Sequence, residues 1–110
     1  MRNSNHKRQG DVYITRVNIN NLDLTDFKPV KPVNGNLILA YGEVTGHHHA
    51  LIDAPTVKLY RNAEGHMIIE VEEETELTHQ EHSSIALEPG MYKAYIQEEY
   101  DPEGMRRVQD

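Results

Sequence analysis

Two pairs of histidines in this 110-residue chain have the types and spacing to do chemistry. His47 and His49 are separated by one residue, and His79 and His82 are separated by two. Side chains along a strand alternate between its faces, so His47 and His49 point the same way if the strand beginning at 37–41 continues through them. In a turn or a short helical segment, residues three apart project to one side. Each pair can therefore present two imidazoles to one ion.

Imidazole is a common ligand of zinc, nickel, copper and iron. All four histidines together could close a tetrahedral site, whereas three of them and a water would leave one reactive position open. We therefore expect the two pairs to meet and to bind a transition metal ion. Zinc is the first candidate, and nickel or iron are the alternatives. The expected ligands are His47, His49, His79 and His82.

Two glutamates accompany these histidines and are the candidate catalytic residues. Glu43 lies on the same alternation as His47 and His49, so it could bind the ion or orient a ligand. Glu81 lies within the second histidine pair, where it could orient a ligand or act as a general base. If the bound ion activates water, the activity would be metal-dependent hydrolysis.

The same histidines could instead lie in exposed loops. The chain would then be a non-enzymatic structural or interaction module that forms a homo-oligomer or binds a protein partner through its acidic surface and its sheet edges. Seven histidines are many for this length, and His6 and His66 are taken as incidental. No Ser/His/Asp motif, phosphate loop or dinucleotide fingerprint indicates another chemistry. Metal binding ranks first, and whether the protein is an enzyme is left open.

The segments that must position these residues alternate with the period of a strand. No segment longer than 10 residues has a clear helical period, and turn signals such as Gly10-Asp11 separate the segments. We expect an all-β domain, a small and mostly antiparallel barrel or sandwich of six to seven short strands. The expected strands include residues 11–19, 37–41, 56–61, 66–72, 83–87 and 91–100.

Length and composition narrow the alternatives further. We expect one domain at residues 10–110, preceded by a basic and flexible arm at residues 1–9. The chain has no cysteine, which excludes disulfides, thiolate catalysis and cysteine-bound zinc and fits a cytoplasmic protein. No apolar run is long enough to span a membrane, and the start of the chain does not resemble a signal peptide. The net charge of −7 makes nucleic acid an unfavourable partner.

Four motifs resemble, in the same order, those of a family of small uncharacterised bacterial and phage proteins. The motifs are QGDV at 9–12, GEVTGHxH at 42–49, LxHxEHxxIxLxPGxY at 77–92 and QxEYxP at 97–102. They cover nearly the whole chain. That family has no assigned activity, so the resemblance implies no function. It does imply that residue 48 varies and that one pattern contains Glu43, His47, His49, His79, Glu81 and His82.

A more distant similarity is to cupins, small β-barrels that hold a metal with an H-x-H pair on one strand. The spacing from Gly42 to His49 is one residue shorter than in the cupin pattern, and Asp53 stands roughly where a cupin has glutamate. Pro89-Gly90 is followed by Met91 where the second cupin motif has histidine. The resemblance therefore implies an analogous architecture and does not carry cupin chemistry over.

Overall fold

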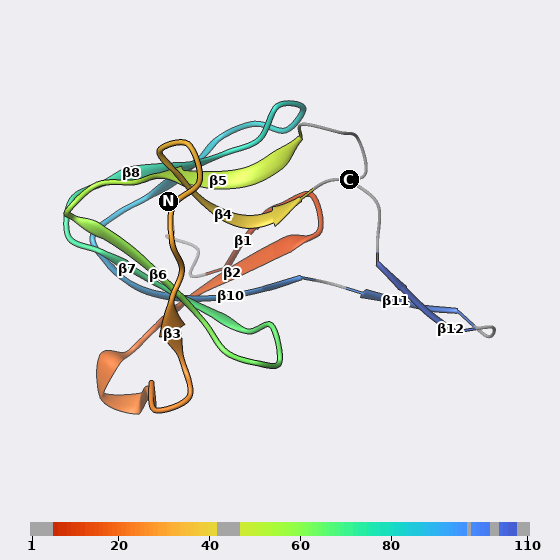
Figure 1. Ribbon diagram of the computed structural model, residues 1–110, viewed down its shortest axis with the longest axis horizontal. Coiled ribbons are helices and arrows are strands. Elements are labelled where there is room, and N and C mark those ends of the chain that lie inside the picture. The colour runs from red at the N-terminus through yellow and green to blue at the C-terminus, as the bar shows by residue number, and fades with distance from the viewer. Residues whose placement is uncertain (1–5, 42–46, 97, 102–103, 108–110) are drawn as a thin grey trace.

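The chain folds into two antiparallel β-sheets that pack against each other (Figure 1). The structure is a computed structural model that describes residues 6–41, 47–96, 98–101 and 104–107. The larger sheet contains β1 (His6–Gln9), β2 (Val12–Val17), β3 (Lys28–Pro29), β6 (Val57–Arg61), β7 (Met67–Val71) and β10 (Gly90–Ile96). Its strands lie in the order β1-β2-β10-β7-β6-β3.

The smaller sheet contains β4 (Asn36–Tyr41), β5 (His48–Ile52), β8 (Thr75–Thr78) and β9 (Ile85–Leu87), in the order β4-β5-β8-β9. A separate hairpin, β11 (Glu98–Asp101) and β12 (Gly104–Arg107), stands out from the two sheets in Figure 1. One 3-10 turn covers Ile19–Asn21. In the described part of the chain, no helix has the length and apolar character needed to cross a membrane.

The all-β prediction is confirmed, and the arrangement is a sandwich and not a closed barrel. The expected six to seven strands are too few, since the two sheets contain ten strands among the described residues. The strands that the pattern failed to predict are short. β1, β3 and β8 have two to four residues each, too few for an alternation of apolar and polar side chains to stand out.

One apolar core lies between the sheets and receives alternate side chains from both. Along β2, Val12 and Ile14 are buried, whereas Tyr13 and Thr15 are not. Leucine, isoleucine, valine and one tyrosine make up most of the core, as a chain with no tryptophan and one phenylalanine requires. The fully buried members include Ile14, Leu39, Leu51, Leu59, Met67, Ile69, Leu77 and Leu87.

Part of the expected N-terminal arm belongs to the larger sheet. His6–Gln9 forms β1 and pairs with β2, with Gln9 opposite Val12. The turn between the two strands uses Gly10 at φ 58°, a backbone conformation that favours glycine. Arg8 Nε donates to the Gly10 carbonyl at 2.7 Å and so supports the turn. The hairpin places the two polar residues beside the turn, Gln9 and Asp11, inside the protein, where they are 2% and 3% exposed.

Two features of the fold bring the histidines together. The strand expected to continue from 37–41 through the first pair does not do so, because β4 ends at Tyr41 and pairs antiparallel with β5, which contains His48 and His49. β5 lies between β4 and β8 in the smaller sheet. The second pair lies in the loop that joins β8 to β9. Ala50 of β5 is opposite Thr78 of β8 in this antiparallel pair, so the residues next to them, His49 and His79, are neighbours as well.

Candidate metal centre

The four histidines predicted as ligands lie together at one end of the sandwich. The ring centroids of His49 and His79 are 4.4 Å apart, and those of His79 and His82 are 4.6 Å apart. His49 and His82 are nearly parallel at 6.0 Å, and His47 contacts His79 edge-on at 5.8 Å. His79 is therefore central to a cluster, here called the histidine cluster, that also contains His47, His49 and His82.

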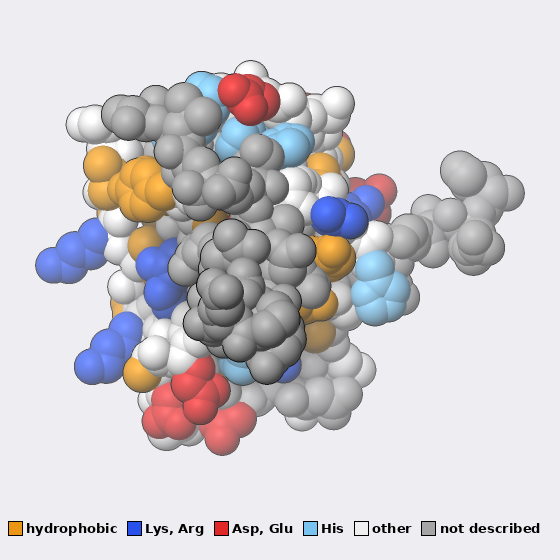
Figure 2. All heavy atoms as spheres, turned by 90° about the vertical axis from the view of Figure 1, so that its right-hand side faces the viewer, with side chains coloured by type: hydrophobic (Ala, Val, Ile, Leu, Met, Phe, Trp, Pro, Cys, Tyr) orange, Lys and Arg blue, Asp and Glu red, His pale blue; other side chains and the backbone are white. Residues whose placement is uncertain are grey.

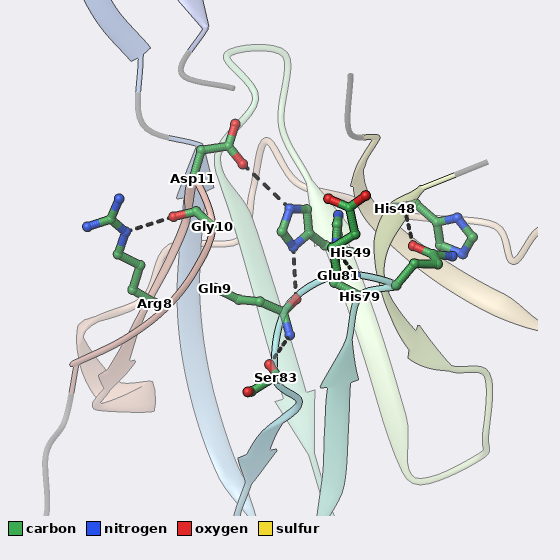
Figure 3. A network of polar contacts seen from close by, with 10 residues as sticks. Arg8, Gln9, Gly10, Asp11, His48, His49, His79, Glu81 and Ser83 are labelled. Atoms are coloured by element: carbon green, nitrogen blue, oxygen red, sulfur yellow. Dashed lines mark hydrogen bonds and ion pairs between the residues drawn. The ribbon is translucent and has the colours of Figure 1, made fainter. Parts of the chain in front are cut away.

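His49 is the most deeply buried member of the cluster, with 0% of its surface exposed. Its Nδ1 lies 2.8 Å from Gln9 Oε1, and its Nε2 lies 3.5 Å from Asp11 Oδ1. Figure 3 shows both side chains reaching the ring from the hairpin that contains Gly10. The hairpin of the larger sheet thus supplies two polar contacts to a histidine that belongs to the smaller sheet.

Gln9 fixes which nitrogen of His49 carries the hydrogen. The Gln9 amide nitrogen donates to the carbonyl oxygens of Leu77 and Ser83, at 2.9 and 2.8 Å. The amide oxygen is therefore the atom that faces His49, and it can only accept a hydrogen bond. His49 Nδ1 must donate to it, which leaves the lone pair of the neutral ring on Nε2, the nitrogen that faces Asp11.

An acceptor oxygen also determines the tautomer of His47, which lies at the surface of the cluster. Its Nδ1 lies 3.3 Å from Glu81 Oε2 and donates to that carboxylate, so the lone pair of the neutral ring is on Nε2. The side chain of Glu81 is half exposed, with 52% of its surface open to solvent. Figure 2 shows histidine side chains and a carboxylate side chain near one another at the upper end of the face it displays. Glu43, the other predicted catalytic residue, lies outside the described residues.

His79 and His82 differ in how their nitrogens are placed. His79 Nδ1 accepts the backbone N–H of Glu81 at 3.0 Å, which places the hydrogen of the neutral ring on Nε2. His82 Nε2 is buried and has no hydrogen-bond partner among the described residues. In this arrangement, residues 6–41, 47–96, 98–101 and 104–107 hold no group of three or more His, Asp or Glu side chains placed to bind a metal ion. The rings are close, but their nitrogens do not converge on one point.

The remaining histidines lie elsewhere. His48 points away from the cluster, as the alternation predicts, and its ring contacts Tyr41 edge-on (Figure 3). Its backbone N–H donates to Gln80 Oε1 at 2.9 Å, which ties the β8–β9 loop to β5. His6 lies 3.2 Å from Thr15 Oγ1, and His66 lies 3.8 Å from Glu64. His6, His48 and His66 are therefore suitable controls for variants of the cluster.

Sequence analysis did not predict that Gln9 and Asp11 belong to the site. They come from the other sheet and precede His49 by 40 and 38 residues, a separation that no local pattern bridges. The signal was present in the QGDV motif, which places a glutamine and an aspartate on either side of a turn glycine.

The fold and the site define an all-β sandwich domain with a partly buried histidine cluster at one end. The chain belongs to the family described as a domain of unknown function, DUF8820, whose model matches residues 8–97. This agrees with the expectation of an uncharacterised family. No curated protein and no solved structure matches the chain. The open sandwich gives no support to the cupin similarity.

Proposed function

We propose that this domain binds one transition metal ion at the histidine cluster, with zinc as the first candidate and nickel or iron as alternatives. The gathering of four imidazoles from two separate segments supports this most strongly. Two imidazoles that bind one zinc ion at about 2.0 Å in tetrahedral geometry have ring centroids about 5 Å apart. The contacts of 4.4–6.0 Å between neighbouring rings lie around that value.

Binding requires one local rearrangement. For His79 to use Nε2 as a ligand, its Nδ1 must carry the hydrogen, so the ring must release the Glu81 N–H. The net cost of one such hydrogen bond is about 0.5–1.5 kcal/mol. Structural zinc sites gain roughly 10–16 kcal/mol at neutral pH, so this cost would not prevent binding. His47 and His49 need no such change, because their Nδ1 atoms already donate.

Metal analysis of protein purified without a histidine tag tests this function. After dialysis against zinc and then against metal-free buffer, the wild type should retain about one equivalent, as a closed site of four ligands does. His47→Ala and His82→Ala should retain much less, while His6→Ala should match the wild type because His6 lies outside the cluster. A wild-type protein that retains no zinc, nickel or iron would overturn the proposal.

A bound ion could also support metal-dependent hydrolysis by activating a water molecule. Of the two predicted catalytic residues, Glu81 lies beside the cluster, and its exposed carboxylate can take a proton from water that approaches from solvent. Its contact with His47 would hold it in place during that step. Glu43 keeps its proposed role as a ligand or base on the basis of the sequence alone.

Glu81→Gln separates hydrolysis from metal binding alone. Glutamine keeps an oxygen that can accept from His47 Nδ1, so the metal content should stay near that of the wild type. Zinc-dependent hydrolysis of 4-nitrophenyl acetate should fall by roughly 10²–10⁴-fold, the usual contribution of a general base. If the zinc-loaded wild type shows no hydrolysis above free zinc, the hydrolytic proposal fails and metal binding stands.

One observation favours the non-enzymatic alternative. The hydrogen bond from Glu81 N–H to His79 Nδ1 belongs to a network in which the rings support one another without an ion. In that case the domain would be a structural or interaction module that forms homo-oligomers or binds a protein. Failure of the metal analysis would favour it. Under both functions we propose a cytoplasmic location, because cysteine is absent, and no nucleic-acid partner, because the net charge is −7.

A further inference from the structure

We infer that the Asp11 carboxylate is a ligand of the same metal ion and that Gln9 is the residue that orients His49 toward it. This inference rests on the proposed metal-binding function and extends the ligand set beyond the four histidines. It gives a role to the two buried polar side chains of the hairpin, which reach across from the larger sheet. Figure 3 shows the chain of contacts from Asp11 through His49 and Gln9 to Ser83.

Gln9 restricts both the tautomer and the orientation of the His49 ring. The amide nitrogen of Gln9 donates to two backbone carbonyls, Leu77 O in β8 and Ser83 O in the β8–β9 loop. Its oxygen holds His49 Nδ1 at 2.8 Å in a fully buried position. Histidines that bind metals commonly donate their second nitrogen to an oxygen in this way, which fixes both the tautomer and the direction of the ring. The lone pair of His49 Nε2 therefore faces Asp11.

The distance between His49 Nε2 and Asp11 Oδ1 favours a shared ion over a direct hydrogen bond. The two atoms are 3.5 Å apart, and both residues are almost completely buried. A charge-assisted hydrogen bond between an imidazolium and a carboxylate is usually about 2.7–2.9 Å long. Two ligand atoms at about 2.1 Å from a tetrahedral zinc ion are about 3.4 Å apart. The observed separation is long for a direct hydrogen bond and fits two ligands on one ion.

A carboxylate among the ligands changes the kind of ion that the site selects. The rings of His49 and His82 are nearly parallel at 6.0 Å, and His82 Nε2 is buried without a hydrogen-bond partner among the described residues. With Asp11 as a further ligand, the site would combine the imidazoles of the cluster with one carboxylate. Such mixed sets of nitrogen and oxygen ligands bind zinc, iron(II) or cobalt(II).

Titration with cobalt(II) and zinc alone tests the inference. The variants are Asp11→Asn, which removes the charge at constant shape, and Asp26→Asn, the same change at an exposed residue, as the matched control. Zinc affinity is measured against a chromophoric chelator, and the visible spectrum of bound cobalt reports the ligands. We expect Asp11→Asn to weaken zinc at least 10-fold and to change the cobalt spectrum, and Asp26→Asn to match the wild type.

Gln9→Leu distinguishes an orienting residue from a ligand. It should weaken zinc binding by about 10–100-fold, as loss of a group that orients a ligand usually does. A long-range proton–nitrogen NMR spectrum should show hydrogen on His49 Nδ1 in the wild type and a mixture of tautomers in Gln9→Leu. The wild-type spectrum with zinc should also show His49 Nε2 bound and the Asp11 carboxyl resonance shifted, a readout that needs no variant to fold.

The outcomes separate this inference from the function on which it rests. If the wild type binds one ion and Asp11→Asn keeps the same affinity and cobalt spectrum, Asp11 is not a ligand and metal binding stands. The same conclusion follows if zinc leaves the wild-type Asp11 resonance unmoved. If the wild type binds no ion, both proposals are overturned, and Asp11 and His49 form a buried pair without metal.

Discussion

His49→Ala should lower the free energy of unfolding by about 4–5 kcal/mol, even with metal removed. Truncating a large buried side chain to alanine costs about 3–5 kcal/mol, because the cavity collapses only in part. The change also leaves Gln9 Oε1 without its donor, and a buried polar atom without a partner costs about 1–3 kcal/mol. These terms overlap and do not add in full. Since domains of this size have total stabilities of about 5–15 kcal/mol, the variant should be close to unfolded.

His48→Ala is the control, because it makes the same change one residue earlier. The His48 ring lies on the opposite face of β5, contacts Tyr41 edge-on and is less buried than His49, so its loss should cost less than about 1 kcal/mol. Urea unfolding followed by circular dichroism in the presence of a chelator measures both variants. If the two variants unfold at the same urea concentration, the buried contacts of His49 do not stabilise the fold.

Zinc at 100 times its dissociation constant should raise the melting temperature of the wild type by about 10–20 °C. A ligand at that concentration stabilises the native state by about 2.7 kcal/mol if it does not bind the unfolded chain. In a small domain, each kcal/mol shifts the melting temperature by roughly 4–8 °C. Acidification should act in the opposite direction to zinc, because imidazoles must lose their added proton to bind a metal. Scanning calorimetry with zinc and with a chelator measures the shift.

Variants of histidines outside and inside the cluster show whether the zinc-dependent shift in melting temperature arises at this site. His6→Ala and His66→Ala should keep the full zinc-dependent shift, since His6 contacts Thr15, His66 contacts Glu64 and neither histidine belongs to the cluster. His47→Ala and His82→Ala should lose most of it. A zinc-dependent shift that survives in the cluster variants would place the ion elsewhere. A wild-type melting temperature that responds to neither zinc nor chelator would favour the interaction module.

The sequence by itself determined the local geometry of this protein. Side-chain alternation in β5 placed His49 inside and His48 outside, because successive residues of a strand must face opposite ways. The same period located β2, β4, β6 and β7 to within about two residues, since each is long enough for the pattern to repeat. Gly10 marked the turn of the first hairpin because few other residues adopt its positive φ.

Only the tertiary structure decided which segments meet and what surrounds the histidines. The pairing of β5 with β8 brings the two histidine pairs together, and the hairpin of the larger sheet adds Gln9 and Asp11. It also decided that the strands form an open sandwich, which strand patterns alone do not distinguish from a barrel. The physical reason is that alternation specifies the face of a strand that is buried, whereas the choice of neighbouring strand depends on packing between residues far apart in the chain.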